Sequence, residues 1–159
     1  MTKVLVVYHS RSGNTAKMAE AVAEGAKNGG AEVAIKKVEE ATLEDLTAAD
    51  GIVFGAPTYF GTLSGEMKSF IDKSVRIRGR LESKVGAAFT SSGSLSGGNE
   101  TTLVSIIEAM LIHGMIIVGD PIETGGHYGA VAVGAPDAEA QMACRKLGER
   151  VAKFAKLIA

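Results

Sequence analysis

The feature that most constrains the fold is a regular alternation of short apolar segments with amphipathic segments of helical period. The short segments are apolar on consecutive positions, which is typical of strands covered on both faces. The amphipathic segments repeat every three to four residues, as helices with one buried face do. The predicted strands are Lys3–Tyr8, Glu32–Val38, Gly51–Gly55, Lys84–Thr90 and Met115–Gly119, and the predicted helices are Asn14–Asn28, Thr42–Ala49, Ser64–Ser74, Glu100–Ile112 and Asp137–Ile158.

Strands that alternate strictly with helices predict a parallel sheet whose right-handed crossovers place helices on both faces. We therefore expect an α/β fold of three layers, a doubly wound five-stranded parallel sheet with strand order 2-1-3-4-5. The strand Glu32–Val38 is the most polar, which favours an edge position. The 159 residues fit one core and show no repeat or linker, so residues 1–159 are predicted to form a single domain.

Charge and composition argue against several classes of function. The formal net charge is −1, whereas a nucleic-acid-binding domain normally carries a basic excess. No apolar run approaches the roughly 20 residues of a membrane helix, and the first run is too short for a signal-peptide core. Cys144 is the only cysteine, and its place on the apolar face of the last helix predicts a packed core thiol. We expect a cytoplasmic protein with no membrane insertion and no nucleic-acid partner.

Ligands of such a sheet bind beyond the carboxyl ends of the strands, and the loops there hold the most unusual composition. The loop after the first strand offers hydroxyl groups, an amide and backbone N–H groups at a helix N-terminus, where the helix dipole favours an anion. Because its only cation is Arg11, we expect it to bind a phosphate mainly through neutral donors. The alternative is an ordinary polar helix cap. This loop is Ser10, Arg11, Ser12, Gly13, Asn14 and Thr15.

Two further loops at the same edge suit a flat ring. Adjacent aromatics follow the third strand, and exposed aromatics at a strand end can stack on a ring, although either one alone could cap the core. The loop after the fourth strand supplies many backbone N–H groups, which can hold the carbonyl edge of a ring and stabilise its reduced anion. The first loop is Ala56-Pro57-Thr58-Tyr59-Phe60-Gly61 and the second is Ser91-Ser92-Gly93-Ser94-Leu95-Ser96-Gly97-Gly98.

Other motifs of nucleotide binding and catalysis are absent from these loops. There is no GxxxxGK[ST] for a nucleoside triphosphate and no GxGxxG for a dinucleotide. There is also no GxSxG nucleophile elbow. A phospho-acceptor receiver of the same fold would carry acidic residues after the first strand and an aspartate after the third, where this chain has His9-Ser10 and Gly55. We also expect no metal site.

Over nearly its whole length the chain resembles the flavodoxin-like NAD(P)H:quinone oxidoreductases of the WrbA family. The matching segments are Val4–Thr15, Val53–Gly61, Phe89–Thr102, His113–Gly119 and Gly125–Ala130. The resemblance implies a flavodoxin-like fold that holds FMN without a covalent bond. It places the FMN phosphate in Ser10–Thr15 and His113 near the flavin as the catalytic residue. It lines the isoalloxazine with Pro57, Thr58, Tyr59, Phe60 and Gly61, and its polar edge with Ser91, Ser92, Gly93, Ser94, Leu95 and Gly97.

The chain departs from the family pattern at three places. It is shorter than typical members, because it goes directly from Val38 to Asp50 without their insertion before the third strand. The loop Gly119–Pro136 is also trimmed. Arginines occupy the segment Val75–Ser83, where longer members have a tryptophan close to the flavin. These departures bear on quinone activity and on tetramer assembly more than on FMN binding.

The resemblance implies an FMN-dependent oxidoreductase that passes two electrons from NAD(P)H to a quinone-like acceptor. NAD(P)H would give hydride to N5 of FMN and leave, and the acceptor would then react at the same face. The alternative is a flavodoxin-type one-electron carrier, which would favour one strong sign of charge for docking. A third interpretation is an FMN-binding sensor without turnover. His127 and Tyr128 lie in a glycine-rich loop over the site, where a role toward the substrate is an open alternative.

The predicted topology places His113 far from the FMN of its own chain. The helix Glu100–Ile112 starts at the ligand edge and extends for roughly 20 Å at 1.5 Å per residue. His113 and the arginines Arg76, Arg78 and Arg80 therefore lie at the opposite pole. Because their family counterparts approach a flavin, we expect a homo-oligomer, a tetramer or a dimer, in which His113 completes a neighbour's site. The alternative is that His113 only ends the helix, where the dipole favours it.

Overall fold

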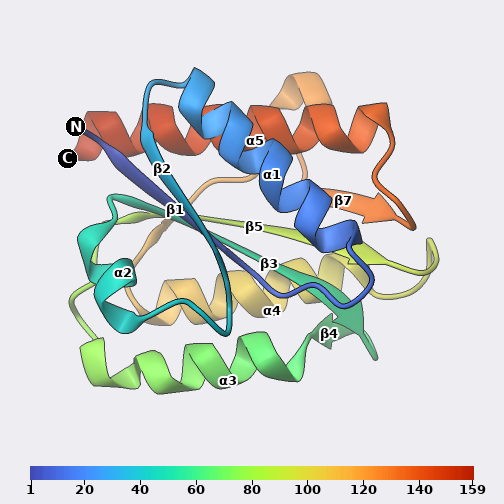
Figure 1. Ribbon diagram of the computed structural model, residues 1–159, viewed down its shortest axis with the longest axis horizontal. Coiled ribbons are helices and arrows are strands. Elements are labelled where there is room, and N and C mark those ends of the chain that lie inside the picture. The colour runs from blue at the N-terminus through green and yellow to red at the C-terminus, as the bar shows by residue number, and fades with distance from the viewer.

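The strands of the central sheet lie in the order β2-β1-β3-β5-β6 and run parallel, in a computed structural model that describes residues 1–159 (Figure 1). This order confirms the predicted one. The strands are β1 (Lys3–Tyr8), β2 (Glu32–Lys37), β3 (Gly51–Tyr59), β4 (Thr62–Leu63), β5 (Val85–Ser92), β6 (Ile116–Ile117) and β7 (Ala130–Val133). The helices are α1 (Asn14–Asn28), α2 (Leu43–Ala48), α3 (Gly65–Lys73), α4 (Asn99–Ile112) and α5 (Ala138–Ile158), with short 3₁₀ turns at Ser74–Ile77 and Ile122–Thr124.

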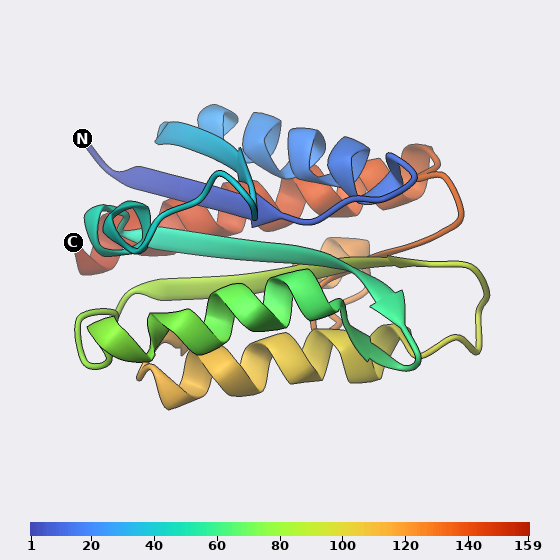
Figure 2. The ribbon, with the colours of Figure 1, turned by 60° about the horizontal axis from the view of Figure 1, so that its bottom comes forward.

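Helices cover both faces of the sheet, which gives the three predicted layers. Figure 2 shows α1 and α5 on one side of the strands and α3 and α4 on the other. Each face has its own apolar core, and alternate residues of one strand serve the two cores. Val4 and Val6 of β1 pack on the α1/α5 side, whereas Leu5 and Val7 pack on the α3/α4 side. Cys144 is fully buried in the first of these cores, as predicted.

The fifth position of the sheet is divided between two strands, which corrects the prediction of one strand at Met115–Gly119. β6 pairs with the start of β5, and β7, which lies inside the segment predicted as a loop, pairs with its end from Phe89↔Ala130 onward. Between these strands the chain leaves the sheet and then returns to it. The backbones of the outgoing and returning segments lie so close together that a side chain at Gly119 would collide with the carbonyl of His127. The sequence signal of β7 is weak because only four apolar residues stand among glycines.

The third strand is longer than predicted, because β3 continues to Tyr59 and folds back on β4 as a hairpin. Ala56 and Pro57 extend the parallel ladder with β5 past the predicted end, and Thr58 and Tyr59 pair with β4. Gly55 is required here, because any side chain at this position would collide with the ring of Phe89 on β5. The hairpin brings the aromatic loop to the carboxyl edge of the sheet, where the candidate site lies.

No helix of the structure combines the length and the hydropathy that crossing a membrane requires. Three of the helices begin at a side-chain cap, which is Thr42 for α2, Ser64 for α3 and Asp137 for α5. The start of α2 has a capping box, in which Thr42 Oγ1 accepts from the Asp45 N–H at 3.2 Å and the Asp45 carboxylate accepts from the Thr42 N–H at 2.8 Å. Lys36 Nζ of β2 also donates to this carboxylate at 2.9 Å.

The Asp45 carboxyl couples the stability of this corner to pH. Burial alone would raise the pKa of Asp45, but hydrogen bonds from Lys36 and Thr42 outweigh it and hold this pKa below its ordinary value. A pKa that is lowered in the folded state stabilises the fold above the unfolded pKa of about 3.9, and this contribution is lost as the pH falls through the folded pKa.

We predict that Asp45→Asn lowers the free energy of unfolding at pH 7 and that its difference from the wild type shrinks toward pH 3. Urea unfolding at the two pH values measures this. Thr42→Ala should cost about 1 kcal/mol at pH 7 through loss of the cap. Glu40→Gln, an exposed carboxylate without a hydrogen-bonded partner, is the matched control and should change little. An equal deficit of Asp45→Asn at both pH values would contradict the assignment.

Candidate functional site

The carboxyl ends of β1, β3 and β5 bring the three predicted loops together. The phosphate-type loop Ser10–Thr15 contacts the end of β5, where Thr15 Oγ1 and Ser91 Oγ form a hydrogen bond of 2.7 Å. The aromatic loop is joined to β5 by a bond of 2.9 Å between Thr58 Oγ1 and Thr90 Oγ1. The predicted loop residues of all three segments therefore share one edge of the sheet, at the right of Figure 1.

The start of α1 has the geometry of an anion site. Gly13 precedes the helix in the left-handed region with φ 98°, and no side chain caps the first turn in the usual way. Ser10 Oγ accepts from the N–H groups of Gly13 and Ala16, both at 3.2 Å. The N–H groups of Asn14 and Thr15 have no partner within the protein. Two unpaired donors at the positive end of a helix dipole suit a phosphate, and this favours the anion interpretation over a simple cap.

The aromatic loop holds Phe60 in a strained and fully exposed position. Phe60 and Gly61 form the two-residue turn between β3 and β4, with φ values of 49° and 78°. The left-handed region suits glycine or asparagine in such a turn, and a bulky side chain there costs about 1–2 kcal/mol. The Phe60 side chain makes up none of this cost by burial, because it is fully exposed. A backbone outlier of this kind is a signal of function. The full exposure of the side chain excludes the alternative that Phe60 caps the core.

The glycine-rich loop after β5 stands beside the aromatic turn. Gly98 approaches Gly61 so closely that a side chain at Gly98 would meet the backbone of Gly61, and Thr101 Oγ1 donates to the Gly61 carbonyl. Ser92 Oγ donates to the Ser94 carbonyl at 3.0 Å and shapes the loop from within. Residues 93–96 are exposed at its tip. The turn and the loop thus form two fixed sides of one site.

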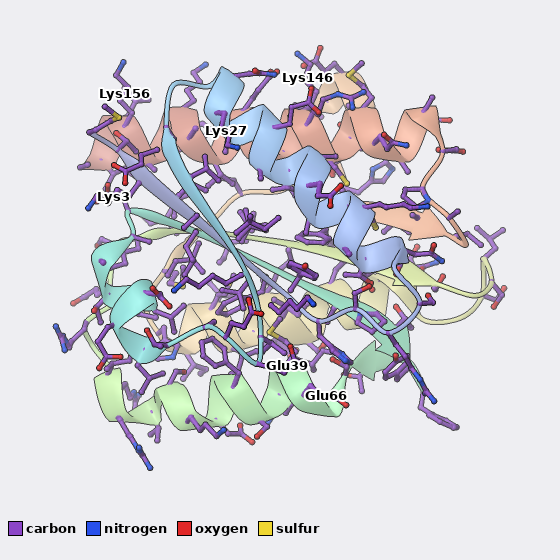
Figure 3. All side chains as sticks on the ribbon, in the orientation of Figure 1. Lys3, Lys27, Glu39, Glu66, Lys146 and Lys156 are labelled. Atoms are coloured by element: carbon purple, nitrogen blue, oxygen red, sulfur yellow. The ribbon has the colours of Figure 1, made fainter.

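His9 belongs to this site, although sequence reasoning made no claim for it. The side chain is buried, its Nδ1 lies 2.9 Å from Ser64 Oγ and 3.5 Å from Glu66 Oε2, and its ring packs edge-on against Tyr59. Ser64 caps α3 and Glu66 lies in the first turn of this helix (Figure 3). His9 therefore ties the end of β1 to α3 and supports Tyr59. The only sequence signal was its place directly before the phosphate-type loop.

His113 is not brought to these loops by its own chain. It follows the last turn of α4 at the opposite pole, where its Nε2 lies 2.7 Å from Ser74 Oγ. Its Nδ1 is buried and has no partner. Burial, with a smaller effect of the Arg78 charge, lowers the pKa of His113 below its ordinary value. The distant position agrees with the prediction made from helix length.

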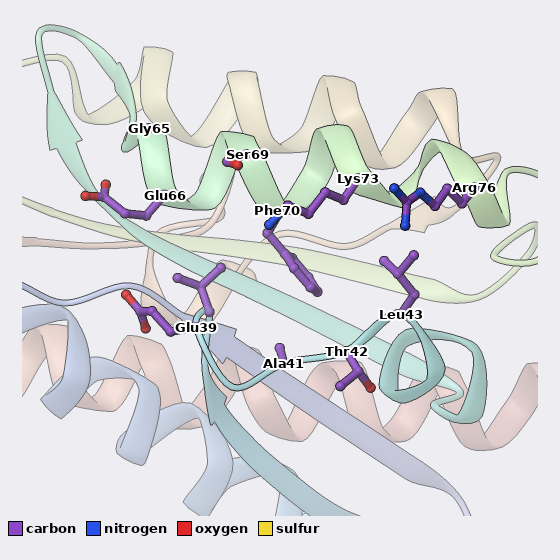
Figure 4. Close-up of a pocket in the computed structure, with 11 residues that line it drawn as sticks. Glu39, Ala41, Thr42, Leu43, Gly65, Glu66, Ser69, Phe70, Lys73 and Arg76 are labelled. Carbon is purple, nitrogen blue, oxygen red and sulfur yellow. The ribbon is translucent and has the colours of Figure 1, made fainter.

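A separate hollow of about 590 Å³ lies between the β2–α2 connection and α3 (Figure 4). None of the predicted site residues lines it. Its charged residues are of both signs, with Glu39 and Glu66 toward one end of α3 and Lys73 and Arg76 along the rest (Figure 4). With two residues of each sign, the hollow has no net charge that would favour an anion or a cation.

The residues of the three loops fit FMN. The free N–H groups of α1 and the hydroxyls beside them suit a phosphate that has one cation, Arg11, nearby. The exposed Phe60 and the glycine-rich loop offer a flat face and a polar edge a short way along the same sheet edge. This is the order in which a phosphate, a linker and a ring succeed one another in the cofactor.

Comparison with known proteins shows the family of the chain. The family described as "Flavodoxin domain" matches residues 5–110. A protein of Archaeoglobus fulgidus named "NAD(P)H dehydrogenase (quinone)" is 42% identical over 188 aligned residues, covering 98% of each chain. A protein of Aquifex aeolicus named "Flavodoxin" is 45% identical and covers 97% of this chain and 87% of its own. The crystal structure of a WrbA-like flavodoxin from Agrobacterium tumefaciens superposes with a TM-score of 0.88, at 32% identity and full coverage of both chains.

We predict that Phe60→Asn raises the stability of the ligand-free protein by about 1 kcal/mol, because asparagine tolerates the left-handed region that phenylalanine resists. Urea unfolding measures the effect. Leu95→Asn is the matched control, since it removes a similarly exposed apolar side chain from the neighbouring loop without relieving a positive φ. Equal stability of Phe60→Asn and the wild type would show that the turn stores no strain.

Proposed function

Because the chain belongs to the flavodoxin family, and within it to the WrbA-like NAD(P)H:quinone oxidoreductases, we propose that it is an FMN-dependent enzyme that passes two electrons from NAD(P)H to a quinone-like acceptor. The observation that carries the proposal is the pair of unpaired N–H groups at the start of α1, next to an exposed aromatic turn. FMN would supply the chemistry, by accepting hydride from one substrate and giving up two electrons to the next.

The residues of the chain have three tasks in this proposal. Ser10, Arg11, Ser12, Gly13, Asn14 and Thr15 hold the phosphate through backbone N–H groups, hydroxyls and one guanidinium. Pro57, Thr58, Tyr59, Phe60 and Gly61 line the ring, and His9 supports Tyr59 from behind. Ser91, Ser92, Gly93, Ser94, Leu95 and Gly97 direct donors at the polar edge, where negative charge gathers on reduction.

A flavodoxin-type electron carrier is the second candidate, and the Aquifex aeolicus relative named "Flavodoxin" favours it. The charge of the chain opposes it. The net charge is −1, from 17 lysines and arginines against 18 aspartates and glutamates, so neither sign dominates the chain. A carrier that docks by steering would need one sign of charge concentrated around the site.

The same proposal includes assembly as a homo-oligomer, a tetramer or a dimer, in which His113 serves a neighbour's site. Apolar side chains gather in exposed positions around His113, namely Val75, Leu111, Ile112 and Ile116. Exposed apolar groups that cluster in this way mark contact surfaces.

A single-domain organisation of residues 1–159 and a cytoplasmic location complete the proposal. All strands of the structure belong to one sheet, and each face has one core. The only thiol is inert, because burial raises the pKa of Cys144 to about 12.

Turnover tests the enzyme proposal directly. We expect NADH or NADPH, added without oxygen to the FMN-loaded protein, to bleach the flavin absorbance, and a benzoquinone to restore it. Thr15→Val should weaken FMN binding by about 1–3 kcal/mol, because it removes a hydroxyl from the phosphate-type loop and leaves Ser91 Oγ without its partner, whereas Thr15→Ser keeps the hydroxyl and should bind as the wild type does. If bleaching requires a separate reductase protein, the electron-carrier candidate is correct.

A mixing experiment tests the neighbour role of His113. Thr15→Val, assayed at an FMN concentration too low to load it, and His113→Ala should each turn over poorly. In a refolded equal mixture, random assembly gives about one site in four an FMN-holding chain and a neighbour with His113, so roughly a quarter of the wild-type activity should return. Ser74→Ala is the matched control, since it removes the intrachain partner of His113 but keeps the imidazole. A role of His113 only at the end of α4 predicts equal effects of the two substitutions and no regain in the mixture. A monomer with full activity would rule out the oligomer.

A further inference from the structure

The outer edge of β7 is a row of unpaired backbone groups. β7 pairs with β5 on one side and with no strand on the other. Gly134 N–H donates to the Ser92 carbonyl at 2.7 Å, so the alternation of a parallel ladder directs Ala130 and Ala132 toward β5 as well. The N–H and C=O groups of Val131 and Val133 therefore face outward, and no hydrogen bond of the structure uses them. Such an edge is a template for another strand.

A groove of about 800 Å³ runs along this edge. Its walls are the first turns of α4 and α5, and ten of its nineteen lining residues are hydrophobic. In Figure 1, β7 lies at the end of the sheet where α5 begins. Leu103 of α4 and Ala140 and Ala143 of α5 form part of the apolar floor.

The segment between β6 and β7 closes one end of the groove. Asp120 is buried there and accepts from the His127 N–H at 2.8 Å and from Thr124 Oγ1 at 3.0 Å, and it lies 3.1 Å from His127 Nδ1. Arg150 of α5 donates to the Asp120 carbonyl at 3.1 Å. These bonds hold His127 and Tyr128, both exposed and both lining the groove, as a fixed end wall.

The polar groups of the groove call for donors and positive charge. Glu100, Asp137 and Glu139 are exposed at its rim, and no lysine or arginine lines it. Asn99 also lines it, and its Oδ1 is buried without a hydrogen-bond donor, although the residue is only 3% exposed. An alternative explanation of Glu100 and Glu139 is that carboxylates in the first turn of a helix compensate its dipole. That explanation does not account for the unpaired Asn99 acceptor or for the free edge of β7.

We propose that this groove binds an extended, basic segment of a partner protein, which adds to the free edge of β7 as a further strand. β7 has four residues, so a segment of four to six residues would match its length of about 13 Å. Alternate side chains of the added strand lie under α4 and under α5, because Val131 packs on one face of the sheet and Ala130 and Ala132 on the other.

Lysine or arginine is the side chain that fits both faces. Its aliphatic stem covers Leu103 on the α4 side or Ala140 on the α5 side, and its charged end reaches the rim at Glu100 or Glu139. A second copy of this chain is a poor occupant, because pairing β7 with β7 would bring two acidic rims together. The groove also lies at the loop end of the sheet, away from His113, so a partner there leaves the proposed oligomer contact free.

The test uses the full-length protein and a fluorescein-labelled peptide of six lysines at low ionic strength. Fluorescence anisotropy should show saturable binding, and NMR should show slower hydrogen exchange of the Val131 and Val133 amides. The double variant Glu100→Gln/Glu139→Gln should weaken binding about three- to tenfold. Glu20→Gln/Glu108→Gln carries the same charge change at exposed positions outside the groove and should bind as the wild type does.

Two further probes separate strand addition from mere charge attraction. The same peptide with alternate amides N-methylated keeps its charge but cannot pair with an edge, and Val131→Pro removes an outward N–H without touching the β5 ladder. Both should abolish binding, while circular dichroism confirms that Val131→Pro is folded. Equal binding of the methylated peptide, or unchanged exchange of Val131 and Val133, would overturn the proposal. So would a dimer of the chain from which the peptide is excluded.

Discussion

The parallel ladder that joins β1, β3 and β5 determines where the three loops of the candidate site lie. In this ladder Val6 pairs with Val53 and Val53 pairs with Ala87, so the three strands end at one edge and deliver their loops there together. The ladder needs close contact between its members, and Gly55 makes room for Phe89 at the centre. On the α1/α5 face, Gly25 and Gly148 let the backbones of the two helices approach each other. Small residues at these points thus fix the position of the start of α1 relative to the ends of β3 and β5.

The sequence was sufficient to predict the parts of this arrangement that depend on local pattern. The helix Asn14–Asn28 has both its apolar face and its limits in the chain itself, and the structure reproduces them. The capping box at Thr42 and Asp45 is likewise a contact between residues three apart. Strand order followed from strict alternation and the handedness of crossovers. The loops of the candidate site could be located for the same reason, because the carboxyl end of a strand is defined once the strand is.

What the sequence did not show depends on residues that are distant in the chain. β7 forms because Ala130–Val133 finds the end of β5 some forty positions earlier, and four apolar residues among glycines carry no local signal of that pairing. His9 becomes part of the site only through Ser64 and Tyr59, which belong to other elements. For Phe60 the sequence left two alternatives open, an exposed ring that stacks on a ligand or a cap on the core. The structure decides for exposure, and it adds a turn conformation that costs energy, which the sequence did not show.

The length of α4 separates two kinds of surface that a small flavoprotein needs. Its first turn stands beside the glycine-rich loop and the β7 groove, and its last turn ends at His113 among exposed apolar side chains. Because a helix is stiff, a contact at the His113 end does not crowd the loops at the other end. The division of the fifth strand has the same consequence at the sheet edge, since the segment between β6 and β7 stands between the two surfaces. The proposed assembly contact therefore lies apart from the three loops and the β7 groove, which meet each other at Leu95.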